Sequence, residues 1–400
     1  MAAPIGLDIG SNSVRAAQVS QGRKGAALER VGQVLLPTGA VREGEIVDPD
    51  VVVAALRDLW KSAKIKGRKV SVGLANQQVV VRRLDLPYMT ESELRASLPL
   101  HVDGLIPLPV DEAVLDFCYL GEHESDDGER MVRIMVVAAL RTMVDELLSV
   151  VRRAKLDPIG IDLDAFAALR SLTPADVLAE RTTEMLVDVG ATVTNLIAHQ
   201  NGAPHFVRTV LFGGQNVTAM LADRLDLDLA DAERLKLELA EDEPASSPPD
   251  DVSEADTDFH GWLSDDPGDQ LTVDELNADS DGTSDDRTAG NAPREVQPGV
   301  DEATDVVRTQ TRRLINEIKS SIDYCATQRD IPSIERVVLT GGASQWPGLA
   351  SAMADQLGLD IATGSPLQTV GNGSGLSDDE LAAAAPHLAV AVGLALGAQQ

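Results

Sequence analysis

Ile5-Gly6-Leu7-Asp8-Ile9-Gly10-Ser11-Asn12-Ser13-Val14 has a counterpart later in the chain, Leu186-Val187-Asp188-Val189-Gly190-Ala191-Thr192-Val193-Thr194-Asn195. In both phrases an apolar strand leads to an aspartate, a β-branched residue and a glycine, and small or hydroxyl residues lead into a second strand. Glycine permits φ > 0 and a close approach of the backbone to a ligand. We predict two equivalent hairpins, one opening each half of the chain.

The predicted hairpin turns have the chemistry of a polyphosphate site. Successive turn amides form a concavity that binds anions, so two turns facing one another across a cleft would hold a phosphate chain from both sides. Asp8 and Asp188 could hold Mg²⁺, which keeps several waters and takes one or two carboxylates plus substrate phosphates. Two ordinary tight turns are the alternative, but their recurrence at matched positions favours a nucleotide site.

Composition limits the class of protein. The chain has 400 residues and a net charge of −30, with 44% hydrophobic and 3% aromatic residues. This length predicts at least two domains or subdomains, and the acidic excess argues against a nucleic-acid partner. Cys118 and Cys325 form no disulfide framework and fit a reducing cytoplasm. The apolar run 388–398 is too short to span a bilayer, so we expect membrane association only through a partner.

Periodicity and composition predict the organisation of the chain. Strands and one helix, 49–64, precede a change of composition at Pro87, and Thr90-Glu91-Ser92-Glu93 is a capping box that starts another helix. An α/β pattern returns at Ile161. We therefore predict a first lobe over 1–86 and 161–185, an inserted α+β subdomain over 87–160, a second lobe over 186–240 and 306–400, and an acidic segment over 241–305.

The acidic segment differs from everything around it. Residues 241–305 contain 21 Asp or Glu against Arg287 and Arg294 only. Such a segment cannot bury enough apolar area to order itself, and a solvated spacer is favoured over a docking segment. We expect order to resume at Val306 with an amphipathic helix to about Gln328, and a final helix over 378–398.

A third motif lies at the end of a buried strand over 336–339. Thr340-Gly341-Gly342-Ala343-Ser344 would let a flat ligand lie against the backbone at the crevice beyond the strand ends, although a plain strand-to-helix turn is the alternative. Glu233 and Lys236 lie three residues apart on a predicted helix, where they could bind ribose, phosphate or base, or form a solvated ion pair. Arg15 could add a cation beside phosphate or face solvent.

Several enzyme classes lack their sequence markers. The chain contains no G-x-x-x-x-G-K-[ST] phrase, which excludes a P-loop enzyme, and no serine nucleophile elbow. The histidines show no metal-ligand spacing.

Taken together, these phrases resemble the phosphate and adenosine signatures of the actin/Hsp70/sugar-kinase superfamily, and most closely the PilM family of type IV pilus assembly proteins. The phrases Val80-Val81-Arg82-Arg83-Leu84-Asp85-Leu86-Pro87 and Ile106-Pro107-Leu108-Pro109-Val110-Asp111-Glu112 single out that family. The resemblance implies an α/β, actin-like, two-lobed fold with duplicated ribonuclease-H-like subdomains and an inserted small α+β subdomain. It also implies bound ATP and Mg²⁺.

The resemblance assigns site residues. Asp8 and Asp188 would hold the metal. Asp162 and Asp164 lie near the place in the chain expected for a group that positions water at the γ-phosphate, but neither is assigned as catalytic, and ATPase activity is expected to be weak or absent. The residues expected to contact nucleotide are Asp8, Gly10, Ser11, Asn12, Ser13, Arg15, Asp188, Gly190, Ala191, Thr192, Thr194, Gly213, Gly214, Glu233, Lys236, Gly341, Gly342, Ala343 and Ser344.

The resemblance also implies a partner and a location. The N-terminal cytoplasmic tail of a PilN-type inner-membrane protein would dock in a groove beside the insert, which places the chain in the cytoplasm at the inner face of the membrane. Contacts with other pilus platform or motor proteins, and self-association, stay open. Two features depart from the family: Arg15 replaces the usual Lys, and the acidic segment is unusually long.

Two other functions fit the superfamily. A sugar or acetate kinase would need an acceptor site, for which the sequence has no marker. A filament protein of the FtsA type would end in a basic amphipathic helix, whereas no Lys or Arg follows Arg336 here, which argues against direct attachment to anionic lipid.

Overall fold

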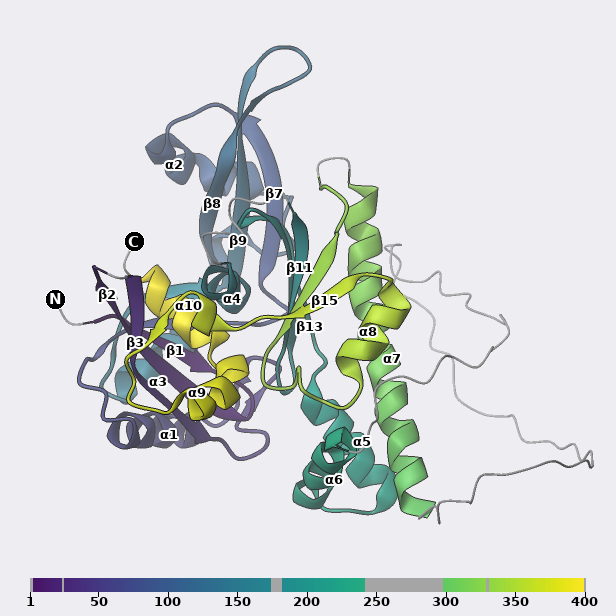
Figure 1. Cartoon of the computed structure of the whole chain (residues 1–400). Coiled ribbons are helices and arrows are strands. Elements are labelled where there is room, and N and C mark those ends of the chain that lie inside the picture. Colours follow the sequence, from purple (N-terminus) through teal and green to yellow (C-terminus); the bar gives the residue numbers. More distant parts are fainter. Residues whose placement is uncertain (1–2, 24, 174–181, 242–297, 329–330, 399–400) are drawn as a thin grey trace, which may run out of the picture.

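The computed structural model describes residues 3–23, 25–173, 182–241, 298–328 and 331–398. These residues form two lobes, each built on a large mixed sheet, and a smaller sheet with α2 that projects from the first lobe (Figure 1). The predicted α/β class and two-lobed arrangement are confirmed.

The two large sheets share one plan. Their strand orders are β10-β6-β1-β2-β3-β16 and β13-β12-β11-β14-β15. In each sheet three consecutive strands pair antiparallel: β1, β2 and β3 in the first, and β11, β12 and β13 in the second. Two later strands continue each sheet on the other side of β1 or β11 and run parallel to it: β6 then β10, and β14 then β15. The predicted duplication is therefore confirmed. The bounds are β1 Ile5–Ile9, β2 Ser13–Gly22, β3 Gly25–Leu35, β6 Lys69–Leu74, β10 Asp157–Leu163, β16 Gly371–Asn372, β11 Thr183–Val189, β12 Thr194–Gln200, β13 Ala203–Val210, β14 Arg336–Thr340 and β15 Asp360–Thr363, with a small β4 Val41–Arg42 and β5 Glu45–Ile46 pair.

The strands that carry the two predicted turns are central strands. Every residue of β11 is buried, and Leu7 in the middle of β1 is fully buried. Strands covered on both faces have continuous apolar runs rather than alternation, which explains the first half of each phrase. Asp8 and Asp188 consequently lie near the carboxyl ends of central strands, where ligand crevices form in α/β sheets.

Helices cover the outer faces of both sheets. α1 begins at Pro49 because the Asp48 side chain accepts a hydrogen bond from Val51 N over 3.2 Å, and proline suits the first helical position. The prediction of a helix over 49–64 is right to within two residues. The first-lobe core contains α1 (Pro49–Ser62) and α3 (Arg141–Arg153), and the second-lobe core contains α5 (Gly214–Leu225), α6 (Leu229–Glu241), α7 (Pro298–Thr327) and α8 (Leu349–Leu357).

The inserted subdomain is a three-stranded antiparallel sheet, β7-β9-β8, that packs with α2. Its elements are β7 Val80–Pro87, α2 Glu91–Val102, the short 3-10 turn η1 Val110–Glu112, β8 Ala113–Glu124 and β9 Arg130–Leu140. The predicted capping box is present, with the Glu93 carboxylate accepting from Thr90 N over 2.8 Å.

The predicted limits of the insert, 87 and 160, are wrong. The sheet of the insert begins with β7 at Val80. At the other end, Val150 and Val151 of α3 are buried in the first-lobe core, and β10 pairs with β6 from Asp157. The second lobe likewise begins with β11 at Thr183 rather than at 186. These boundaries depend on which core an apolar side chain enters, which periodicity does not reveal.

The C-terminal segment returns to the first lobe. β16 pairs with β3, and α10 (Ala389–Gly397) packs against β1, β2 and α4 (Asp164–Leu172). Figure 1 shows α10 beside the strands of the first sheet. Assigning all of 306–400 to the second lobe is therefore wrong for the residues from β16 onward.

The single helix predicted over 378–398 is also wrong. Pro386 lies in a 3-10 turn, η4 (Ala385–His387), that separates α9 (Asp378–Ala384) from α10, since proline cannot continue a helix interior. A second 3-10 turn, η3, spans Pro366–Gln368. Among the described residues no single helix has the length and apolar composition to cross a membrane, although the bent pair Asp378–His387 and Ala389–Gly397 meets those two criteria together, with 83° between its halves.

The acidic segment ends earlier than predicted. α7 begins at Pro298 rather than at Val306, and Ala303 is fully buried in the second-lobe core. Proline at the first helical position explains the start. The rest of the predicted segment, 242–297, lies outside the described residues.

Close packing of α10 on α4 depends on Gly393. A Cβ there would lie 1.7 Å from the carbonyl oxygen of Ala167, a backbone atom that cannot move independently. We expect Gly393→Ala to lower the free energy of unfolding by about 1–3 kcal/mol, the usual cost of overpacking, as measured by urea denaturation. Gly22→Ala is the control, because a Cβ there would lie 3.7 Å from its nearest neighbour, the carbonyl oxygen of Gly25, which is an ordinary contact. Equal stability of the two variants would contradict the prediction.

Candidate functional site

A cavity of about 690 Å³ lies between the two lobes, beside both hairpin turns. The first lobe supplies the β1–β2 turn and the start of α4, and the second supplies the β11–β12 turn, α5, α6 and the turn after β14. We call this cavity the cleft. The predicted site residues that line it are Asp8, Gly10, Ser11, Asn12, Arg15, Asp164, Asp188, Gly190, Ala191, Gly214, Glu233, Lys236, Gly341, Gly342 and Ala343.

Each of the two hairpin turns contains a backbone hydrogen bond of the same kind. Gly10 N donates to Ser13 O over 3.0 Å, and Gly190 N donates to Val193 O over 2.9 Å. A Cβ on Gly190 would lie 2.7 Å from that Val193 oxygen, so only glycine fits the turn. Each aspartate precedes its glycine by two residues, and both turns therefore present a carboxyl group and backbone amides in the same relation.

Asp8 and Asp188 are buried acids with different partners. Arg15 Nη1 donates to Asp8 Oδ2 over 3.1 Å, and Asn195 Nδ2 donates to Asp188 Oδ2 over 3.4 Å. Burial raises the pKa of Asp8 despite the opposing charge of Arg15. Burial also raises the pKa of Asp188 to about 6, against the hydrogen bond from Asn195. A cation in the cleft would offset the cost of keeping both groups ionised.

Asp164 is the third acid in the cleft. Its Oδ1 is buried and accepts no hydrogen bond within the described ranges. Burial, followed by the charges of Asp8 and Asp188, raises the pKa of Asp164 well above its ordinary value. No set of three His, Cys, Asp or Glu side chains among the described residues converges as direct metal ligands. Asp8, Asp164 and Asp188 are the aspartates of the cleft that could hold a metal ion.

The lobes are in contact across the cleft. The hydroxyl oxygens of Ser11 and Thr192, one from each turn, are 2.5 Å apart and hydrogen-bonded. At the rim, Gln215 Nε2 donates to Thr38 Oγ1 over 3.5 Å. These contacts hold the two lobes together beside the cavity that both turns line.

Lys236 forms the ion pair with Glu233 that the sequence offered as an alternative, but the lysine is buried rather than solvated. Its Nζ donates to Glu233 Oε2 over 2.8 Å, to Thr218 Oγ1 over 3.0 Å and to Gly214 O over 3.3 Å. Three bonds use the full donor capacity of an ammonium group. Lys236 therefore orients Glu233 toward the cleft, and a direct bond from Lys236 to phosphate is not available in this arrangement.

The glycine pair after β14 fits closely against the second turn. Gly341 has φ of +95°, and a Cβ there would lie 2.6 Å from Asp188 Oδ1 and 2.4 Å from Val189 O. Only glycine combines that conformation with that approach. The pair therefore packs closely against the second turn and the His387 ring, at the wall of the cleft that both glycines line.

Some predicted residues do not line the cleft. Thr194 Oγ1 donates to Phe212 O over 2.7 Å inside the second lobe, and Ser13 is fully buried, so neither is placed to contact a ligand. Their roles in the sequence pattern are structural. The other predicted site residues that do not line the cleft are Thr192, Gly213, Ser344 and Asp162.

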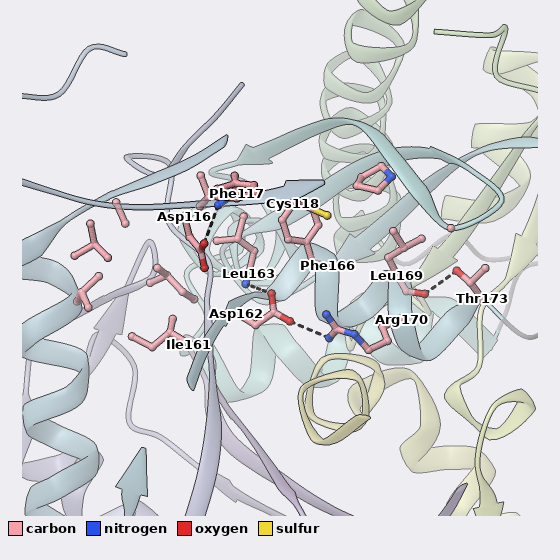
Figure 2. A pocket seen from close by; sticks show the side chains of 17 residues that line it. Asp116, Phe117, Cys118, Ile161, Asp162, Leu163, Phe166, Leu169, Arg170 and Thr173 are labelled. Atoms are coloured by element: carbon pink, nitrogen blue, oxygen red, sulfur yellow. Dashed lines mark hydrogen bonds and ion pairs between the residues drawn. The ribbon is translucent and has the colours of Figure 1, made fainter. Parts of the chain in front are cut away.

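A second cavity, of about 710 Å³, lies where the inserted subdomain meets the first lobe (Figure 2). We call it the groove. One face of β8 and β9, together with α3, β10 and α4, supplies a mostly apolar lining, and Gly202 and Pro204 of the second lobe also reach it. Its apolar side chains include Val114, Val137, Val144, Ile161, Phe166 and Leu169.

Asp162 belongs to the groove and not to the cleft. Figure 2 shows its carboxylate bonded to Arg170, whose Nη1 is 2.8 Å from Asp162 Oδ2, and Leu163 N donates to the other oxygen over 2.8 Å. The suggestion that Asp162 acts at the γ-phosphate is therefore corrected. Asp164, two residues later, faces the cleft because it starts α4.

The family model described as type IV pilus assembly protein PilM matches residues 6–244. The chain belongs to this family. The solved structure named "PilM-PilN type IV pilus biogenesis complex" is similar to it at a TM-score of 0.76 and 25% identity, over 99% of this chain and 98% of that chain. Ethanolamine utilization protein EutJ from Carboxydothermus hydrogenoformans shares the fold at a TM-score of 0.52 and 13% identity, over 98% of this chain and 89% of that chain.

The second half of the chain also matches a model for cell division protein FtsA, over residues 185–393. FtsA of Bacillus subtilis (strain 168) is 22% identical over 386 residues, which cover 90% of this chain and 78% of the relative. FtsA of Rhizobium meliloti (strain 1021) is 26% identical over 420 residues, which cover 97% of this chain and 85% of the relative. The FtsA model match begins after the inserted subdomain, whereas the PilM match includes it.

Sequence analysis missed several residues that line the cleft of this PilM-family chain. His387 had a usable signal, because Pro386 inside a predicted helix requires a break that turns neighbouring side chains in a new direction. The other cleft-lining residues that were not predicted lie near a motif in the sequence or in segments without a recognisable pattern. They include Thr38, Gln215, Leu229, Leu237 and Trp346.

Proposed function

We propose that this PilM-family chain is a nucleotide-binding scaffold of the type IV pilus assembly platform. In this proposal Mg-ATP binds in the cleft, and the N-terminal cytoplasmic tail of a PilN-type membrane protein binds in the groove. The observation that carries the nucleotide site is the pair of equivalent turns, with Asp8 and Asp188, that face one cavity from opposite lobes.

The phosphate chain would lie between the two turns. Amides of both turns are suited to phosphate oxygens, and Asp8 and Asp188 would hold Mg²⁺ through its waters. Arg15, now paired with Asp8 over 3.1 Å, can bind phosphate and carboxylate together because its guanidinium has five donors. Arg15 therefore still supplies a cation at the phosphate, although the family usually has Lys at this position.

The nucleoside would lie toward the second lobe. Glu233, oriented by Lys236, is placed to accept hydrogen bonds from ribose hydroxyls, and the turn at Gly341 and Ala343 would lie beside the base. A cavity of about 690 Å³ falls within the range of sites that enclose small molecules, about 300–1,000 Å³.

Calorimetry tests this site directly. Titrating Mg-ATP and Mg-ADP into the purified full chain should give saturable binding, and omitting Mg²⁺ should weaken it, because the acids of the cleft then repel the phosphates. Absence of any heat with both nucleotides, from protein shown to be folded, would overturn the proposal.

The groove fits an extended tail with apolar side chains. Its lining is mostly apolar, and its two acids are already paired, Asp162 with Arg170 and Asp116 with Arg95. The similar solved structure carries PilN in its name, which supports a PilN-type tail as the occupant here. Such docking would hold the chain in the cytoplasm at the inner face of the membrane through its partner.

Hydrolysis, where it occurs, would depend on Asp164. Asp164 lines the cleft, and its buried Oδ1 lies against Gly73 without a hydrogen-bond partner in the described residues, so its other oxygen is the one that would orient a water toward phosphate. We expect Asp164→Asn to lower ATP turnover by about 100-fold, within the range for losing such a group, with little change in nucleotide affinity. Asp157→Asn, at the exposed start of β10, is the control. Unchanged turnover in Asp164→Asn would remove this role.

A filament protein of the FtsA type is the second candidate, because the FtsA model matches residues 185–393. That function predicts ATP-dependent polymers that sediment with anionic liposomes. We expect no such sedimentation for the full chain without a partner tail, since no basic residue follows Arg336.

A further inference from the structure

His387 lines the cleft but belongs to none of the motifs that define it. It ends the 3-10 turn η4, in the segment that carries the chain back to the first lobe. Its imidazole therefore faces the cleft from a third direction, different from those of the two hairpin turns. The inference below rests on the nucleotide site proposed above.

The imidazole lies against the glycine pair after β14. A Cβ on Gly342 would lie 2.5 Å from His387 Nδ1 and 2.7 Å from Cε1. Any side chain at position 342 would displace the ring, so glycine is needed there for the imidazole to fit. It gives the imidazole a fixed place at the wall of the cleft.

The protein does not fix the hydrogen bonding of this ring. Nδ1 is buried and has no hydrogen-bond partner within the described part of the chain. A buried polar atom without a partner costs free energy, and in native structures such atoms call for an explanation. Since Nδ1 faces Gly342, Nε2 is the nitrogen left to meet a molecule in the cleft.

Arg15 places a positive charge near His387. Burial and then the charge of Arg15 lower the pKa of His387, so the ring is neutral and one nitrogen carries a proton. Arg15 is itself paired with Asp8, α10 carries no ionisable side chain, and the acids of α9 are exposed at the far end of that helix. A phosphate near Arg15 and His387 would offset the effect of Arg15 and raise the pKa of the ring.

We propose that His387 Nε2–H donates a hydrogen bond to a phosphate oxygen of the bound nucleotide. The segment that joins the second lobe to the first thus contributes a phosphate-binding residue of its own. Only the phosphates are involved, so adenosine should bind without using His387.

Two variants separate hydrogen bonding from packing. His387→Leu removes the donor at similar size, and we expect it to weaken Mg-ATP and Mg-ADP binding about tenfold, as for the loss of a bond to a charged group, with adenosine binding unchanged. His387→Gln can place an amide near the Nε2 position and should retain affinity within about threefold. His205→Leu, a half-buried histidine outside the cleft, is the control. Equal affinities for His387→Leu and the unaltered chain would overturn the inference.

Nuclear magnetic resonance gives a readout that packing would not move. The chain has six histidines, so ¹⁵N-labelled imidazole signals can be assigned by their loss in His387→Gln. Mg-ADP should shift the His387 nitrogens and raise the pKa of the ring, whereas adenosine should not. Nucleotide binding with an unmoved His387 signal would overturn this inference alone. A failure of the unaltered chain to bind nucleotide would overturn the proposed function and this inference with it.

Discussion

Asp188→Asn is expected to abolish magnesium-dependent nucleotide binding. The substitution keeps the size and can still accept the hydrogen bond from Asn195, but it removes a charge that Mg²⁺ needs. We expect the affinity for Mg-ATP to fall at least about 30-fold, as for the loss of one partner of a buried charge pair, and the difference between measurements with and without Mg²⁺ to vanish. Calorimetry measures both. Asp360→Asn, at an exposed position on β15, is the control.

Without nucleotide, Asp188→Asn is expected to raise the free energy of unfolding. Burial raises the pKa of Asp188 from 3.8 to about 6, so the folded state favours the neutral carboxyl group. Its contribution to stability is fully present below about pH 4 and is lost as the pH rises through 6. Asparagine is neutral throughout, so Asp188→Asn should be more stable than the unaltered chain at pH 7.5, by up to roughly 3 kcal/mol. Urea denaturation at pH 4.5 and 7.5 should show this difference shrinking with falling pH. A destabilised variant at pH 7.5 would show that the carboxylate is held by contacts other than those described.

Val114→Trp is expected to prevent tail docking while sparing the nucleotide. Val114 is half-buried on β8 and lines the groove, so an indole there would occupy the volume that a tail needs. We expect the affinity for a peptide of a PilN-type N-terminal tail to fall at least about 100-fold, as at a binding hot spot, measured by fluorescence anisotropy. Affinity for Mg-ATP should stay within about twofold.

Tyr119→Trp is the matched control for this experiment. Tyr119 lies on the same strand, is 51% exposed and does not line the groove. A tail that bound Val114→Trp and Tyr119→Trp equally well would show that the groove is not its site. Loss of nucleotide binding in Val114→Trp would instead indicate misfolding of the first lobe.

Local chemistry explains what the sequence could predict. The hairpin turns are recognisable because Gly10, Gly190 and Gly341 occupy positions where bare backbone is needed, and Asp8 and Asp188 lie at fixed spacing from the glycines. The capping box at Thr90 is equally local. Features of this kind depend on a few neighbouring residues, so they are visible before the chain is folded.

Tertiary contacts explain what the sequence could not predict. Lys236 looked free to bind phosphate, but its Nζ is occupied by Gly214, Thr218 and Glu233, and Thr218 and Gly214 come from another helix. Asp162 and Asp164 looked equivalent, and only the start of α4 separates them between the groove and the cleft. No pattern in the sequence assigns α10 to one lobe rather than the other.

The return of α10 bears on the order in which this polypeptide can acquire its native contacts. β1 packs against α10, whose residues 389–397 are synthesised more than three hundred codons after it. Contacts of such high sequence separation are slow to form. The apolar surface of β1 that α10 covers therefore stays uncovered by its native partner until α10 has been synthesised.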